Sequence, residues 1–167
     1  MNVLDNLNNR IRFYENNYNI NEKKQEEYYS PVTDKEIKLL EEYAGFKLPN
    51  DYITFLKETN FKKKEAGIAL SFISNSGSQI IVALWNIKEI MEQRNWYPFL
   101  EEYKGDMLII GDDLGDSFFM YQNGQNGFGI YVEDAGACVP LGNAAKLSNT
   151  LTELLVEGKG LDNEFFL

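Results

Sequence analysis

The chain has 167 residues, of which 44% are hydrophobic and 14% aromatic, so it is long and apolar enough to bury a core of its own. It carries 26 acidic and 16 basic residues, a formal net charge of −10, and no histidine. Phosphate backbones and anionic lipids repel such a chain, so we expect neither nucleic acid nor a membrane as a partner. A cationic protein would be attracted, although acidity also serves solubility by itself.

Residue types alone exclude several kinds of catalytic site. Without histidine, no Ser-His-Asp or Cys-His site and no zinc-protease motif can form. The single cysteine, Cys138, has no partner for an intramolecular disulfide, which is typical of a reducing compartment. The first residues lack the apolar core of a signal peptide, and no segment approaches the roughly 18 apolar residues of a membrane helix. We therefore expect a cytoplasmic protein without a cofactor, and we predict that it is not an enzyme.

The first 30 residues are polar, but apolar side chains recur in them at spacings of three and four. These are Val3, Leu4, Leu7, Ile11, Tyr14 and Tyr18. The period predicts an amphipathic helix over residues 3–18, followed by a link that ends near residue 30. We expect this helix to pack on the single main domain, residues 31–167; a helix that docks only on a partner is the alternative.

The next segment predicts two consecutive helices with clear end signals. Thr33 and Glu36 have the spacing of a capping box, and Gly45 follows the first helical pattern as a left-handed stop. Pro49 suits the first position of the second helix, where its missing N–H would have no partner anyway. Asp51 lies in the first turn of that helix, where the helix dipole favours an anion.

From residue 68 onward the pattern changes to short strands separated by tight turns. We predict strands over 68–74, 79–84, 107–111, 117–122, 128–132 and 137–141, a helix over 87–94 that is capped by Asn86, and a closing helix that ends at Gly158. Strands joined by tight turns pair as antiparallel neighbours, because parallel neighbours need long crossovers. The predicted fold class is therefore α+β, with a largely antiparallel twisted sheet flanked by helices.

The segment between Lys104 and Lys146 contains no Lys or Arg, while acidic residues gather at its predicted turns. These residues are Asp106, Asp112, Asp113, Asp116, Glu133 and Asp134. Turns at one end of an antiparallel sheet often share a rim, which would present a negative surface to a basic protein. Two alternatives stay open for the aspartates of 112–116: a hard cation or acid–base site, and a purely structural role, since Asp and Gly are typical turn residues.

Aromatic residues alternate along the strands that follow this loop. They are Phe118, Phe119, Tyr121, Phe128 and Tyr131. Alternation places half of them toward the core, and the other half cover a helix or contact a partner.

Two motifs resemble those of the SUKH superfamily, the domains related to the yeast regulators of cell-wall glucan synthesis. Leu48-Pro-Asn-Asp-Tyr-x-x-Phe-Leu56 is similar to the family's Leu-Pro-x-Asp-Tyr-x-x-Phe-Leu. Ile110-Gly-Asp-Asp-Leu-Gly-Asp116 is similar to a shortened form of its Ile-Gly-Asp-Asp-Gly-Gly-Gly-Asp stretch. The resemblance covers residues 33–156. The chain departs from the family at Leu114, which takes a glycine's place, and after Asn60, where the family often has Asn-Gly-Gly.

This resemblance implies a SUKH-like sheet flanked by helices and a role as a bacterial immunity protein. Such a protein is a cytosolic antidote that binds and neutralises a cognate toxin, commonly a nuclease, without catalysing a reaction. A regulatory or scaffolding protein-binding module is the alternative, because some relatives have that role. On the first hypothesis the partner is a cationic toxin, and no metal ligands are predicted. The predicted partner-binding residues are Asp112, Asp113, Asp116, Phe118, Tyr121, Glu133 and Asp134.

Overall fold

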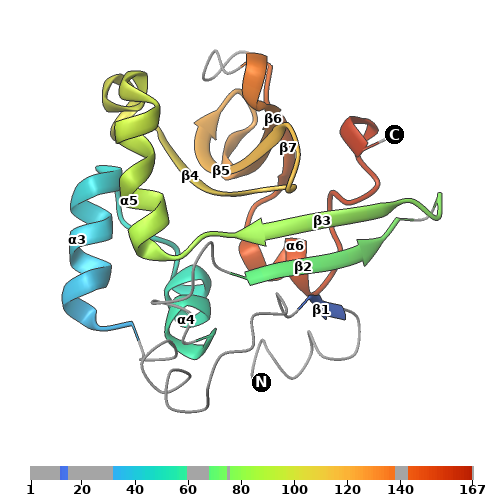
Figure 1. Cartoon of the computed structure of the whole chain (residues 1–167), viewed down its shortest axis with the longest axis horizontal. Coiled ribbons are helices and arrows are strands. Elements are labelled where there is room, and N and C mark those ends of the chain that lie inside the picture. Colours follow the sequence, from blue (N-terminus) through green and yellow to red (C-terminus); the bar gives the residue numbers. More distant parts are fainter. Residues whose placement is uncertain (1–11, 15–31, 60–67, 75, 138–142, 167) are drawn as a thin grey trace.

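The computed structural model of the chain describes residues 12–14, 32–59, 68–74, 76–137 and 143–166. These residues form an α+β fold in which helices accompany a seven-stranded sheet (Figure 1). The strands follow one another in sequence order from β1 to β7, and each neighbouring pair is antiparallel. The predicted fold class, an antiparallel sheet flanked by helices, is confirmed.

Helix α3 (Asp34–Ala44) has the end signals that the sequence predicts, and helix α4 (Asn50–Thr59) begins one residue after Pro49, the residue predicted at its first position. The Thr33 Oγ1 atom accepts from the Glu36 backbone N–H at 3.3 Å, and the Glu36 carboxylate accepts from the Thr33 N–H at 2.9 Å. Gly45 then ends α3 with a φ of 80°. Pro49 directly precedes α4, and its carbonyl accepts a hydrogen bond from the Ile53 N–H. Local chemistry therefore sets both ends of α3, and the chain enters α4 directly after Pro49.

The other elements follow the predicted alternation of short strands and helices. They are β2 (Ile68–Ile73), β3 (Gln79–Leu84), α5 (Ile87–Trp96), the 3₁₀ helix η1 (Pro98–Tyr103), β4 (Met107–Asp112), β5 (Ser117–Gly124), β6 (Gly127–Asp134), the 3₁₀ turn η2 (Ala135–Ala137), β7 (Ala145–Ser148), α6 (Leu151–Leu155) and the 3₁₀ turn η3 (Glu164–Phe166). Asn86 caps α5 as predicted, accepting from the Glu89 N–H at 2.8 Å.

The sheet has two parts that meet at a short junction. The β2–β3 hairpin projects from the rest of the molecule, whereas β4, β5 and β6 curl together (Figure 1). Strand β3 pairs with β4 only at Ala83–Asp112 and Leu84–Gly111. A Cβ atom at Gly111 would lie 2.0 Å from the Ala83 carbonyl oxygen, so the two strands meet this closely only because residue 111 is glycine. The junction places the end of β3 beside Asp112.

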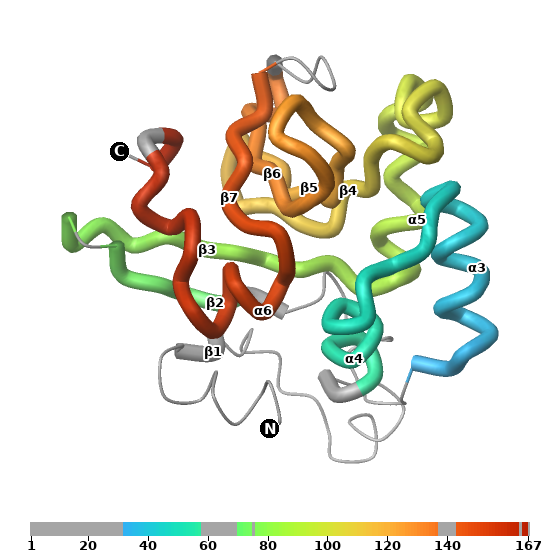
Figure 2. Tube along the Cα trace, turned by 180° about the vertical axis from the view of Figure 1, so that it is seen from behind, coloured from blue at the N-terminus to red at the C-terminus, as the bar shows by residue number. Residues whose placement is uncertain are grey.

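Helices cover the curled part of the sheet and complete the core. Helices α3 and α5 lie side by side, with α5 nearer to the curled strands (Figure 1). Tyr52 of α4 packs against Tyr121 of β5, with ring centroids 5.3 Å apart. Asp51 joins α4 to α6, because its carboxylate accepts from the Thr152 N–H at 2.9 Å. Figure 2 shows the segment after α6 crossing β3 toward the C-terminal end.

Two sequence predictions need correction. Residues 12–14, expected within a helix over 3–18, form strand β1 (Arg12–Tyr14), which pairs with residues 69–71 of β2. The edge of β2 offers unpaired backbone N–H and C=O groups, and pairing with them outweighs the weak helical period. The rest of that expected helix and the link near residue 30 lie outside the described residues. The division of the chain at residue 30 stays a prediction.

The second correction concerns the strand predicted over 137–141, because the sheet ends at a later strand. Ala137 belongs to the 3₁₀ turn η2, and residues 138–142, including Cys138, lie outside the described residues. The last strand is instead β7, which pairs with β6 through a register shift between Ile130 and Tyr131. The sequence predicts Leu147 in the closing helix together with Leu151, Leu154 and Leu155, but Leu147 belongs to β7 and only the other three lie in α6 (Leu151–Leu155).

Candidate functional site

Two turns meet at one end of the curled strands. The first, 113–116, joins β4 to β5, and the second follows β6. Their backbones are linked directly, because the Ala135 N–H donates to the Asp116 carbonyl at 2.6 Å. Ser117 also pairs with Asp134 across β5 and β6. Four of the predicted binding residues are thereby gathered in one place, and we call them the acidic rim: Asp112, Asp113, Asp116 and Asp134.

Most rim carboxylates also build the turns on which they lie. Asp112 Oδ1 accepts from the Leu114 N–H at 2.9 Å. Asp113 Oδ1 accepts from two backbone N–H groups, at 2.9 and 3.0 Å, and Asp134 Oδ1 accepts from the Gly136 N–H at 2.7 Å. These are the local bonds for which aspartate is favoured in turns. The structural role predicted as an alternative is therefore present, and it fixes the direction in which the charges point.

The negative charge of the rim has no local counterion in the described part of the chain. No salt bridge there involves any of the four rim aspartates. Lys146, which closes the base-free segment, donates its Nζ to the Asn126 carbonyl at 2.7 Å, at the turn on the opposite end of β5 and β6. Asp116 and Asp134 are exposed, and Asp112 and Asp113 are half-buried. The rim is therefore a region of uncompensated negative potential.

Leu114 lies in the first turn and has a left-handed backbone conformation, which residues other than glycine rarely adopt. Its φ is 60°, and no other non-glycine residue within the described ranges has a positive φ. Its side chain is 65% exposed. The position is the one at which the resemblance expects glycine, and the structure shows why glycine suits it. An apolar side chain therefore projects from the centre of the acidic rim.

Three predicted binding residues are buried: Phe118 and Glu133 lie next to the rim, whereas Tyr121 lies farther along β5, where its ring packs against Tyr52 and Phe128. Phe118, Tyr121 and Glu133 are 6%, 0% and 2% exposed. The Phe118 ring packs against Trp85 and Tyr97, with centroids 5.8 and 5.6 Å apart. Strand alternation failed to separate core from surface here because both faces of the curled strands are covered. As folded, these three side chains are part of the core, so a partner could reach them only after the side chains that cover them had moved.

Trp85 contributes to the site in a way that the sequence did not predict. Its indole N–H donates to Asp112 Oδ2 at 3.0 Å, and its backbone N–H donates to the Ile110 carbonyl at 2.8 Å. The sequence predicts for Trp85 only an apolar contact with Ile90, as the hydrophobic staple of the helix that Asn86 caps. The indole bond depends on the β3–β4 junction, which links residues far apart in the chain. Trp85 thereby fixes the orientation of one rim carboxylate.

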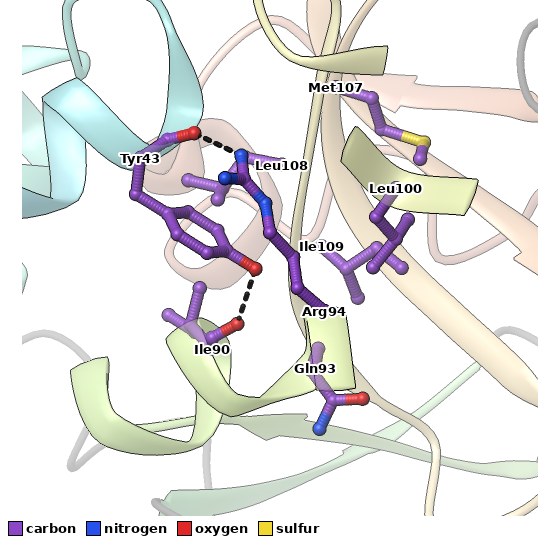
Figure 3. A pocket seen from close by; sticks show the side chains of 8 residues that line it. All are labelled: Tyr43, Ile90, Gln93, Arg94, Leu100, Met107, Leu108 and Ile109. Atoms are coloured by element: carbon purple, nitrogen blue, oxygen red, sulfur yellow. Dashed lines mark hydrogen bonds between the residues drawn. The ribbon is translucent and has the colours of Figure 1, made fainter. Parts of the chain in front are cut away.

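A hollow between α3, α5 and β4 is too small to be a ligand site. Arg94 fills it, as Figure 3 shows: its guanidinium donates to the Tyr43 carbonyl and lies 3.8 Å from the centroid of the Tyr43 ring. Arg94 also forms a 2.7 Å ion pair with Glu101, and the Tyr43 hydroxyl donates to the Ile90 carbonyl at 3.0 Å. The remaining space holds a water molecule and little more. The arrangement ties α3, α5 and η1 together.

The described residues give no support to a metal site. Among them, no three or more Asp, Glu, Cys or His side chains are placed to hold a metal ion.

A search of the same ranges for helices long and apolar enough to cross a membrane finds none.

Comparison with known proteins places the fold in a family. Residues 31–157 match the model of the SMI1/KNR4 family, also termed SUKH-1. No curated protein matches the chain. The matched residues extend from the entry into α3 to the end of α6 and include the whole acidic rim. The chain therefore belongs to the SMI1/KNR4 (SUKH-1) family.

Proposed function

We propose that this protein is a non-catalytic immunity-type protein that binds and neutralises a cognate bacterial toxin in the cytoplasm. Family membership supports a domain that binds partner proteins. The observation that carries the proposal further is the acidic rim, in which four carboxylates lie together without a salt bridge in the described part of the chain.

The chemistry of the rim favours a cationic partner, and a nuclease is the toxin class that fits best. A nuclease must attract the phosphates of its substrate with basic residues. Carboxylates held in fixed positions by backbone N–H groups present negative oxygen atoms to the same basic residues. The exposed Leu114 side chain adds an apolar contact at the centre of this surface. Binding there would occlude the nucleic-acid site of the toxin.

The test is co-expression of the chain with the toxin encoded in the neighbouring gene. We expect the chain to restore growth and to co-purify with the toxin. The variant D113N/D116N/D134N should lose protection, because asparagine retains the turn-forming oxygen and removes only the charge. The matched control is E42Q/E102Q/E157Q, which removes three exposed carboxylates elsewhere in the chain.

Two results would overturn the proposal. The first is a toxin that kills equally with and without the chain and forms no complex with it. The second is a complex in which the toxin stays fully active, which would indicate the regulatory or scaffolding role instead.

A further inference from the structure

A row of three side chains crosses the sheet at the acidic rim and shares Asp112 with it. Phe118 of β5 pairs with Asp112 of β4 on one side and with Glu133 of β6 on the other. Directly paired residues in an antiparallel sheet project from the same face, so these three side chains share one face. The row is the last before the two turns, because β4 ends at Asp112 and Asp134 follows Glu133.

Glu133 has no partner in this row. It is 2% exposed, and within the described ranges neither of its carboxylate oxygens has a hydrogen-bond partner. Burial, together with the neighbouring charge of Asp134, raises the pKa of the Glu133 carboxyl above its usual range. A buried carboxylate without a hydrogen bond or counterion is a net cost to the folded state. The fold therefore gains nothing from an acid at this position.

The row that contains Glu133 has the composition of a site for an organic cation. Trp85 and Tyr97 each contact the ring of Phe118, the middle residue of the row, edge to face. Asp112 lies at the other end of the row, about 10 Å from Glu133 by the usual spacing of strands. Aromatic rings attract cations through their faces, and carboxylates bind guanidinium groups with two hydrogen bonds. A guanidinium over the Phe118 ring would lie between the two carboxylates.

We propose that the Asp112–Phe118–Glu133 row receives an arginine side chain of the partner protein, with Glu133 as its counterion. The inference deepens the proposed function and rests on it, because the acidic rim would guide the same cationic partner. Arginine fits better than lysine, because its planar group stacks on aromatic rings and is more weakly hydrated. The arginine must displace the side chains that cover Glu133, so we expect weak binding of the isolated amino acid.

The test uses blocked arginine, N-acetyl-arginine amide, as the probe. The full-length chain, labelled with ¹³C, is titrated while the side-chain carboxyl signals are followed by NMR. We expect the Glu133 signal to move saturably, with a Kd on the order of millimolar. N-acetyl-citrulline amide, which has the same shape without the charge, should leave the signal unchanged.

Two variants test whether Glu133 itself is the counterion of the arginine or whether any negative charge on the protein attracts it. Binding to the variants is followed at the Asp112 carboxyl signal, which both retain. Glu133→Gln should weaken arginine binding at least tenfold, whereas Glu102→Gln, a change at an exposed acid of η1, should leave it unchanged. Equal arginine binding by wild type and Glu133→Gln would overturn the inference. The inference would also be overturned if the Glu133 signal of the wild type does not shift during the titration while the signals of the rim aspartates do. Because no toxin is present, failure here leaves the immunity proposal standing, and failure of co-expression leaves arginine binding standing.

Discussion

Leu114, in the turn that carries Asp113 and Asp116, exposes an apolar side chain and destabilises the fold through its backbone conformation. Its positive φ costs about 1–2 kcal/mol for a residue with a Cβ atom. We predict that Leu114→Gly raises the free energy of unfolding by about 0.5 kcal/mol, because relief of this strain exceeds the greater chain entropy of glycine. Urea denaturation measures the change. Leu114→Ala keeps the strain and should be neutral, so an equal gain in both variants would contradict the explanation.

Glu133 provides a second prediction, which concerns the pH dependence of stability. Because the pKa of its carboxyl is raised by burial and then by Asp134, the folded state binds this proton more tightly than the unfolded chain does. The wild-type protein therefore loses free energy of unfolding as the pH rises from 4.5, the ordinary pKa of a glutamate carboxyl, through the raised pKa of Glu133. Glu133→Gln does not titrate at this position. The nearby carboxylates, Asp134 as the next residue of β6 and Asp112 in the same row, are present in both proteins.

Glu133→Gln should consequently have a higher Tm than wild type at pH 7 and nearly the same Tm at pH 4. Thermal unfolding followed by circular dichroism at the two pH values measures this difference. A Tm difference that is the same at both pH values would show that the carboxyl is not perturbed.

The residues of the rim were predictable to the extent that their chemistry is local. Aspartates next to glycines indicate a tight turn, and the absence of Lys and Arg from 105–145 indicates uncompensated charge. The burial of Phe118, Tyr121 and Glu133 was not predictable, because it depends on which elements cover each face of the sheet. The hydrogen bond from the Trp85 indole N–H to Asp112 was not predictable for the same reason, because it forms only where β3 meets β4.

At the scale of elements, the junction between β3 and β4 is the narrowest link in the sheet. We predict that Gly111→Ala destabilises the protein by about 3 kcal/mol, because a Cβ atom 2.0 Å from the Ala83 oxygen would force the strands apart. Gly77→Ala is the control: its φ is positive, but no atom lies within 4 Å of the added carbon, so the loss should be about 1 kcal/mol. Urea unfolding of both variants, with equal m-values, measures the difference. Equal losses would mean that the strands can separate freely at the junction.

Helix ends were predicted well and short strands poorly, for a physical reason. The caps at Thr33, Gly45 and Asn86 are bonds between residues close in the chain, so the sequence shows both partners. Strands β1 and β7, of three and four residues, form because a neighbouring strand offers hydrogen-bonding groups. Such strands carry no period of their own that a sequence could reveal.

For the whole molecule, the net charge of −10 matters through its distribution. The four rim aspartates lie at one end of the curled strands, while the lysine that follows them points to the other end. A field of this shape orients an approaching cationic partner as well as attracting it. Orientation by charge should appear in the association rate more than in the dissociation rate.

We therefore predict that association with the neighbouring gene's toxin slows by about tenfold when salt rises from about 0.01 to about 0.1 M, because the Debye length falls from about 30 to about 10 Å. Dissociation should change little over the same range. Stopped-flow mixing measures both rates. The two triple variants, D113N/D116N/D134N and E42Q/E102Q/E157Q, carry the same net charge, so they separate the rim from total charge. Only the first should show a flattened salt dependence; equal slopes in both would mean that net charge alone, and not the acidic rim, attracts the partner.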